Sequence, residues 1–204
     1  MEHINSWKNK DVFLKQLQLN ISQISSRDNY PLHWISFIEI MKKLNCKKFL
    51  DIGCGAGIYY KLIKDNFKDI DYFGIDYSED AINIAKEYWK YDGFEVRDMW
   101  NIDENYIKDY DLVHMGALLD VLPNANEALD FILKLKPKIL FLSRIEYSGT
   151  IVDSVYTYTA YDEITTYKFK HSQEILKEFI SRNNYEFEEY QFTNNSYNII
   201  CKRA

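Results

Sequence analysis

Short apolar runs recur along most of this chain, separated by stretches in which apolar positions repeat every three or four residues. The short runs predict β-strands at residues 49–52, 72–76, 93–97, 110–115 and 137–143. The intervening stretches predict helices at about 57–68, 78–90 and 125–135. A strand followed by a helix and another strand predicts a βαβ unit with a right-handed crossover. The pattern therefore predicts an α/β domain with a mostly parallel sheet.

The N-terminal part of the chain precedes this alternation and carries helical signals only. Residues 8–23 place apolar side chains among polar ones at helical spacing. A second helix opens at Pro31, which suits a first helical turn, and continues to about Leu44. We expect these two helices to cover a sheet edge or the mouth of a pocket.

The C-terminal part also departs from the alternation. Residues 145–170 are polar and aromatic, and the alternation at residues 155–158 predicts an extended arm. A helix beginning at Ser172 follows the arm. Two further strands at residues 185–193 and 196–203 predict a C-terminal hairpin.

Composition narrows the classes of function. The chain has 204 residues, enough for one domain, and its net charge of −6 lacks the basic footprint of a nucleic-acid-binding protein. It starts Met-Glu-His without an apolar signal segment, and no apolar run approaches the ~20 residues that span a bilayer. The three cysteines show neither metal-ligand spacing nor a disulfide pattern. We therefore expect a cytoplasmic protein without a nucleic-acid or membrane partner.

The stretch from Phe49 to Gly57 carries the clearest chemical signal, a strand with Asp51 near its end and then a glycine turn. The three glycines have the spacing Gly-x-Gly-x-Gly, and Ile58 stands where a dinucleotide-binding loop would place its last glycine. An acid beside such a loop is a poor neighbour for a phosphate. It suits a cationic ligand better, such as an ammonium or a sulfonium.

This loop resembles the first motif of the class I S-adenosylmethionine-dependent methyltransferases of small-molecule type. The resemblance continues through Asp76 and Asp98, which end the next two strands, and through Gly116 after the fourth strand. It implies S-adenosyl-L-methionine as the cofactor and no metal. The implied fold is a doubly wound, Rossmann-like, seven-stranded sheet that is mostly parallel, with one antiparallel strand in the C-terminal hairpin and helices on both faces.

The resemblance also divides the chain. It implies a single methyltransferase domain consisting of an N-terminal helical cap, a cofactor-binding core, an acceptor-site arm, and a C-terminal helix with its hairpin, at residues 1–45, 46–143, 144–170 and 171–204. We expect a monomer or a homodimer.

The family's motifs assign roles to several strand-end residues. Asp76, 19 residues after Gly57, would accept hydrogen bonds from the two ribose hydroxyls; the alternative is an acid that caps a helix. Asp98 would bind the adenine amino group, the Met99 amide would face a ring nitrogen, and Trp100 is a candidate wall for the adenine. The full predicted cofactor-binding set is Asp51, Gly53, Cys54, Gly55, Gly57, Asp76, Tyr77, Asp98, Met99, Met115 and Gly116.

Catalysis is less clear from the sequence. Many small-molecule members carry a histidine in the run after the fourth strand, and Val121 stands at that position here. Either the acceptor needs no general base or the base comes from elsewhere. The candidates are His33, His171, Asp120 and a tyrosine at the rim, although Asp120 also has a structural interpretation. We expect His114, inside the fourth strand, to be a hydrogen-bonded core histidine.

The acceptor site is predicted from the helical cap and the arm. The candidates for acceptor binding are Tyr30, Trp34, Arg144, Tyr156 and Tyr158. Arg144 would hold an anionic acceptor through paired hydrogen bonds, unless it forms a surface ion pair. The arm would line the acceptor pocket, unless it is an edge strand rich in β-forming residues.

Four functions are consistent with these features. The first is transfer of a methyl group to an oxygen or nitrogen of a small molecule, which chain length, acidity and the aromatic arm favour. The second is methylation of a protein or an RNA. The third, a nicotinamide-dependent oxidoreductase, is disfavoured by Ile58 and by the lack of a suitably placed Tyr-x-x-x-Lys-like pair. The fourth is a methyltransferase-fold protein without catalysis.

Overall fold

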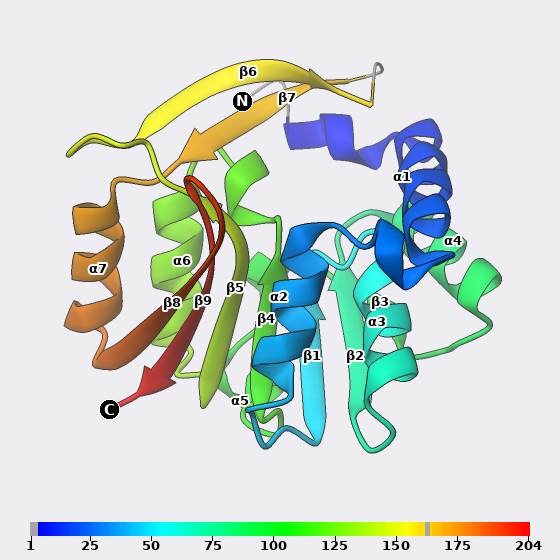
Figure 1. The fold of residues 1–204 in the computed structure, drawn as a ribbon, viewed down its shortest axis with the longest axis horizontal. Helices are drawn as coiled ribbons and strands as arrows, with labels where there is room; N and C mark the ends of the chain where they lie inside the picture. The colour runs from blue at the N-terminus through cyan, green and yellow to red at the C-terminus, as the bar shows by residue number, and fades with distance from the viewer. Residues whose placement is uncertain (1–3, 162–163) are drawn as a thin grey trace.

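A computed structural model describes residues 4–161 and 164–204 of the chain. Its centre is a seven-stranded sheet in the order β3-β2-β1-β4-β5-β9-β8 (Figure 1). The strands are β1 (Lys48–Ile52), β2 (Asp71–Asp76), β3 (Phe94–Val96), β4 (Leu112–Gly116), β5 (Ile139–Glu146), β8 (Tyr185–Thr193) and β9 (Ser196–Arg203). Neighbours among the first five strands pair in parallel, and β9 runs antiparallel to both β5 and β8. The predicted sheet, with its one antiparallel strand, is confirmed.

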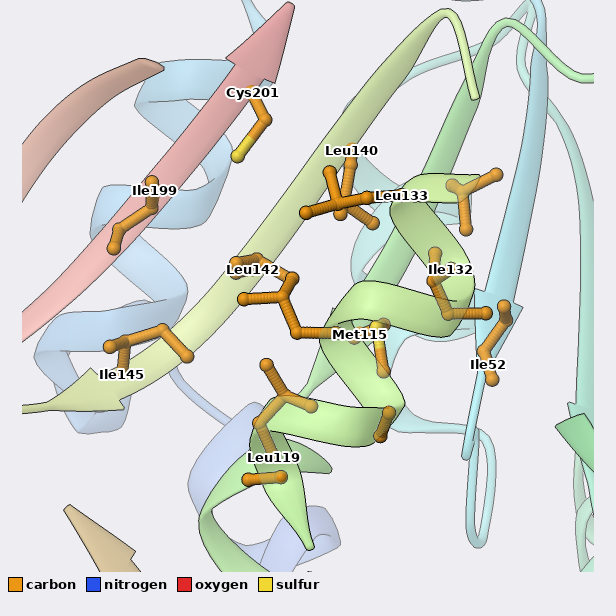
Figure 2. Close-up of a cluster of buried hydrophobic side chains, with 14 of the residues drawn as sticks. Ile52, Met115, Leu119, Ile132, Leu133, Leu140, Leu142, Ile145, Ile199 and Cys201 are labelled. Atoms are coloured by element: carbon orange, nitrogen blue, oxygen red, sulfur yellow. The ribbon is translucent and has the colours of Figure 1, made fainter. Parts of the chain in front are cut away.

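Helices cover both faces of this sheet, because side chains alternate along each strand. Phe49 and Phe141 pack with α2 (Leu32–Met41), α3 (Ile58–Asn66) and α4 (Glu79–Trp89). Leu142 points to the other face, toward Ile132 and Leu133 of α6 (Ala125–Lys134) (Figure 2). Leu50 and the buried side chains of α7 (Gln173–Arg182) belong to the same cluster. The short helix α5 (Glu104–Ile107) lies on that second face and was not predicted from the sequence.

Strand β5 extends further than the sequence predicts. A β-bulge between Leu142 and Ile145 shifts the register, and pairing with β9 then continues to Glu146. The predicted end at residue 143 was too early because polar residues follow it, although the strand there is still paired with β9. The bulge places Arg144 in the left-handed region, at φ 66°. Bulges of this kind re-aim a side chain next to a site.

A second layer lies over the carboxyl ends of the parallel strands (Figure 1). It consists of the 3₁₀ helix η1 (Ile4–Lys8), α1 (Lys10–Ile24) and the antiparallel arm of β6 (Ser154–Ala160) and β7 (Ile164–Lys170). The Trp7 indole donates a hydrogen bond to Thr166 Oγ1 at 2.8 Å, and the Lys15 ammonium donates one to the Tyr161 carbonyl at 3.2 Å. We call this layer the roof.

Two parts of the predicted segments lie outside the described residues, namely residues 1–3 of the helical cap and residues 162–163 of the arm. None of the helices within residues 4–161 and 164–204 combines the length and hydrophobicity of a membrane span.

Candidate active site

A cavity of about 450 Å³ lies between the strand ends and the roof, a volume within the usual range for small-molecule sites. The sheet order sets the order of its walls. Asp98 follows β3, Asp76 ends β2 and the glycine turn follows β1, whereas Gly116 ends β4 and Arg144 lies on β5. We call the β3-β2-β1 side the nucleoside half and the β4-β5 side the acceptor half.

The glycine turn requires its glycines for two reasons. Gly53, Gly55 and Gly57 all have positive φ values, from 52° to 81°, which side chains rarely tolerate. A Cβ atom on Gly55 would also lie 2.7 Å from Oε1 of Gln16, a residue of α1. That same oxygen accepts a hydrogen bond from the Ala56 amide at 3.1 Å. Helix α1 therefore covers the turn directly through Gln16.

Asp76 lies at the floor of the nucleoside half with both carboxylate oxygens engaged. Oδ2 accepts a hydrogen bond from the Gly55 amide and Oδ1 one from the Ser78 amide, each at 2.9 Å. Burial raises the pKa of Asp76 to about 6, although these two amides oppose the rise. Helix α4 is capped by the Ser78 side chain, so Asp76 is not its N-cap. Each oxygen keeps a lone pair for a ligand donor.

The rest of the nucleoside half comes from the segment after β3. Asp98 caps a short 3₁₀ helix, η3 (Met99–Asn101), through a hydrogen bond from the Trp100 amide to Oδ1 at 3.0 Å. Tyr77, Asp98 and Met99 of the predicted cofactor set line the cavity, together with Trp100, the candidate wall for the adenine. Burial raises the pKa of the Tyr77 hydroxyl, which is therefore neutral at physiological pH.

Asp51 is placed differently. It is buried beneath the glycine turn and does not line the cavity. It accepts a hydrogen bond from the Tyr72 hydroxyl at 2.7 Å and meets His114 Nδ1 at 2.7 Å, while His114 Nε2 meets Ser143 Oγ at 2.9 Å. This buried chain joins β2, β1, β4 and β5. His114 is confirmed as a hydrogen-bonded core histidine. Asp51 is separated from the cavity by the glycine turn.

Three other members of the predicted cofactor set are also packed away from the cavity. Cys54 and Met115 are buried in the core and are not part of its lining. Gly57 begins α3, where a Cβ atom would lie 2.8 Å from Cζ of Phe94. These residues support the turn and the strand end. Their neighbours Gly53, Gly55 and Gly116 line the cavity and can contact a ligand there.

Gly116 stands where the two halves meet. A Cβ atom there would lie 2.5 Å from Cε2 of Tyr59 and 2.6 Å from Cε1 of His114. The sequence predicts a small residue so that a ligand can approach the backbone. The structure adds a packing reason, because aromatic rings fill the space behind Gly116.

Asp120 and Arg144 form the polar part of the acceptor half. The Asp120 side chain lines the cavity with only 4% of its surface exposed. Its Oδ2 accepts a hydrogen bond from Lys168 Nζ at 3.1 Å, and Arg144 Nη2 lies 3.8 Å away. Its Oδ1 is buried and has no hydrogen-bond partner within the residues that the structure describes. Tyr158 on β6 also lines this half.

The two histidine candidates lie outside the cavity lining. The His33 ring packs against Trp34 and Phe192, and burial together with the charge of Arg144 lowers its pKa to about 3. His171 is fully buried against Phe169, and neither of its ring nitrogens has a hydrogen-bond partner in the described part of the chain. Burial lowers its pKa to about 4. Both rings are neutral at pH 7, and neither lines this cavity.

Three acceptor candidates are also outside the lining. Trp34 is buried in the core beside Tyr30, with ring centroids 5.6 Å apart. Tyr156 lies further along β6, on the same face of the arm as Tyr158, and its ring lies 5.9 Å from Lys170 Nζ. The structure brings Asp120, Arg144 and Tyr158 together and places the other candidates elsewhere.

Several lining residues were missed by the sequence analysis. They come mainly from the roof and from the loop after β4, namely Trp7, Phe13, Gln16, Leu118, Leu122, Thr159, Ala160 and Tyr161. The helical periodicity around Phe13 and Gln16 was visible, but it did not indicate which face would meet the glycine turn.

The cavity can accommodate the predicted cofactor. The carboxylates of Asp76 and Asp98 line its nucleoside half beside the glycine turn, and Arg97, which also lines this half, is hydrogen-bonded to Glu95. A donor-rich, cationic ligand therefore fits there. Within the described residues, no group of three histidine, cysteine or acidic side chains is arranged to hold a metal ion.

Comparisons with known proteins agree with this geometry. Residues 50–136 match a family model described as a methyltransferase domain, a span from β1 to just beyond α6. No curated protein matches the sequence.

Solved structures share the fold at low identity. An S-adenosylmethionine-dependent methyltransferase from Clostridium acetobutylicum has a TM-score of 0.66 at 12% identity, over 94% of this chain and 99% of that one. The N-terminal domain of EvdMO1 with S-adenosylhomocysteine bound has a TM-score of 0.65 at 12% identity, over 88% and 85%. The sugar N-methyltransferase KedS8 from Streptoalloteichus has a TM-score of 0.61 at 11% identity, over 84% and 87%. The chain therefore has the fold of the S-adenosylmethionine-dependent methyltransferases, and its residues 50–136 match a methyltransferase domain.

Proposed function

We propose that this protein is an S-adenosylmethionine-dependent methyltransferase that acts on an oxygen or nitrogen atom of a small-molecule acceptor. The observation that carries the proposal is the continuity of the cavity, which runs from the nucleoside half to Asp120, Arg144 and Tyr158 beneath the roof. An acceptor bound there would lie in a pocket partly enclosed by the arm and η1. KedS8, which shares the fold, acts on a sugar, and an acceptor of comparable size fits such a pocket.

In this proposal the nucleoside half binds the cofactor. Asp76 accepts hydrogen bonds from the ribose hydroxyls, and Asp98, Met99 and Trp100 surround the adenine. Bound S-adenosylmethionine supplies a methyl group that its sulfonium already activates for in-line displacement. The protein's remaining task is to position the nucleophile and to exclude water, and positioning alone contributes ~7–11 kcal/mol in well-oriented systems.

Asp120 is the proposed catalytic residue of the acceptor half. Its buried Oδ1, unpartnered in the described part of the chain, would accept the hydrogen of the acceptor's hydroxyl or amine. This hydrogen bond orients the nucleophile and gives its proton a destination. Val121, at the position where many relatives carry a histidine, lines the cavity but has no proton to exchange.

The test follows the methyl group. Purified protein is incubated with methyl-labelled S-adenosylmethionine and a cell extract separated into metabolite, protein and RNA pools. We expect the label in the metabolite pool, and Asp120→Asn to reduce its rate of incorporation by ~100-fold, the lower range for losing an acid–base group. Label found only in the protein or RNA pool would overturn the proposal.

A further inference from the structure

The Arg144 guanidinium has unused hydrogen-bonding capacity in the acceptor half. A guanidinium carries five N–H donors and remains charged at all physiological pH values. Within residues 4–161 and 164–204, the Arg144 side chain makes no hydrogen bond, and its nearest carboxylate oxygen is Asp120 Oδ2 at 3.8 Å. The side chain is 44% exposed and lines the cavity, so a ligand in the acceptor half can reach it.

The backbone holds Arg144 in this orientation at a cost. Its φ of 66° lies in the left-handed region, which is unfavourable for a residue with a long side chain and persists only where the surroundings enforce it. Here the Arg144 amide donates a hydrogen bond to Oδ1 of Asn198 at 3.2 Å. Asn198 is itself fully buried, and its amide group donates to the His33 carbonyl at 3.3 Å. The bulge and Asn198 together aim this arginine at the cavity.

The charges around Arg144 do not cancel. Lys168 bridges Asp120 and Glu146 at 3.1 and 3.0 Å, and Lys170 pairs with Glu146 at 2.5 Å. This connected group, with Arg144, has three basic and two acidic side chains, which leaves one positive charge in excess. The excess charge lies at the cavity, although the whole chain has a net charge of −6. Lys168 donates a hydrogen bond to Asp120 Oδ2, so Arg144 shares this carboxylate at 3.8 Å and has no hydrogen-bonded counter-charge among the described residues.

We propose that Arg144 binds an anionic group of the methyl acceptor, so that the substrate is a small acid whose nucleophilic hydroxyl or amine lies close to a carboxylate or phosphate. The inference rests on the proposed function and adds the class of acceptor. The spacing supports it, because the unpartnered Oδ1 belongs to the same carboxylate whose Oδ2 lies 3.8 Å from Arg144. An acceptor that satisfied both residues would carry its anion and its hydrogen-bond donor within a few bonds of each other.

The test measures binding of defined probes to the protein saturated with S-adenosylhomocysteine. The probes are 2-hydroxybenzoate for a carboxylate, 2-hydroxyphenyl phosphate for a phosphate and 2-hydroxybenzamide as the neutral control, titrated by ligand-observed NMR. We expect at least one acid to bind about tenfold or more tightly than the amide, and the acid that does so identifies the anion.

Two variants separate this contact from general electrostatics. Arg144→Gln should weaken binding of the preferred acid by about tenfold or more, the scale of a hydrogen bond to a charged group. Arg27→Gln makes the same change in net charge at an exposed site outside the cavity and should leave acid binding unchanged. Both variants should bind S-adenosylhomocysteine like the unmodified protein.

The outcomes distinguish the two proposals. If neither acid binds better than the amide, or if both variants weaken acid binding equally, the anionic acceptor is overturned. In that case label incorporated into neutral metabolites would leave the proposed function intact. Label absent from the metabolite pool but present in protein or RNA would overturn the proposed function itself.

Discussion

The two halves of the cavity are built in different ways. In the nucleoside half, the Asp76 carboxylate is held by two backbone amides, and Asp51 below it is held by Tyr72 and His114. In the acceptor half, Asp120 keeps an unpartnered oxygen, and Arg144 has no hydrogen bond from its side chain among the described residues. The nucleoside half is therefore preorganised by the protein alone. The acceptor half has hydrogen-bonding capacity that no described protein group satisfies.

The largest expected effect concerns the buried support of the nucleoside half. His114→Leu removes a hydrogen-bonding partner of the buried Asp51 carboxylate, and breaking such a pair costs ~3–5 kcal/mol. We expect a loss of this size in the free energy of unfolding, measured with urea. Ser143→Ala, which removes the hydroxyl at the other ring nitrogen, should cost only ~0.5–1.5 kcal/mol. Equal losses in the two variants would show that Asp51 does not depend on His114.

The next prediction distinguishes the two halves by how a substitution in each changes the affinity for S-adenosylhomocysteine. Asp76→Ala removes the proposed acceptor for the ribose hydroxyls, and we expect the binding free energy of S-adenosylhomocysteine to weaken by ~1–3 kcal/mol, measured by calorimetry. Asp120→Asn changes the acceptor half instead, so its affinity for the same ligand should stay within about twofold. A larger loss from Asp120→Asn than from Asp76→Ala would reverse the assignment of the two halves.

The pH dependence of cofactor binding provides a third, smaller test. Burial raises the pKa of Asp76 to about 6, and hydroxyl donors favour its charged form, so the ligand lowers this pKa. Binding must therefore release a proton below pH 6, and affinity should fall as the pH decreases. Between pH 7.5 and 5 we expect a loss of about tenfold for S-adenosylhomocysteine. Asp76→Asn should bind more weakly but show a flat profile, and a matching pH dependence in that variant would exclude Asp76 as the titrating group.

The smallest effect concerns the roof. Trp7→Phe removes the hydrogen bond from the indole to Thr166 Oγ1, worth ~0.5–1.5 kcal/mol in the free energy of unfolding. Amide hydrogen exchange should accelerate in β6 and β7, with less change in α4. Thr166→Val removes the other partner, so the double variant should cost less than the sum of the two single changes. Full additivity would mean that this hydrogen bond does not join η1 to the arm.

The difference between the halves also explains what the sequence could predict. Asp76, Asp98 and the glycine turn follow strands whose apolar patterns are clear, so their common edge of the sheet could be predicted from the order of elements alone. Cys54 and Met115 were predicted to bind the cofactor, but both are buried in the core and do not line the cavity. Sequence spacing does not tell whether a side chain faces the cavity or the core. His33 and His171 were candidates by chemistry, and only burial in the folded chain removes them from reach.

The acceptor half depends on contacts between distant segments. Lys15 donates a hydrogen bond to the Tyr161 carbonyl, and Trp7 donates one to Thr166, although each pair is far apart in the sequence. No periodic pattern in the sequence predicts such long-range contacts. The orientation of Arg144 depends on a β-bulge and on Asn198, which belongs to a strand that pairs with β5 only after folding. A polar residue at a strand end was visible in the sequence, but its positive φ and its excess charge were not.

A crystal structure with S-adenosylhomocysteine would test the division of the cavity most directly. We predict that the ribose hydroxyls lie within hydrogen-bond distance of Asp76, that the adenine lies beside Asp98, and that the sulfur faces Asp120 and Arg144 past Gly116. A nucleoside bound instead among Asp120, Arg144 and Tyr158, with Asp76 free of ligand, would contradict this account.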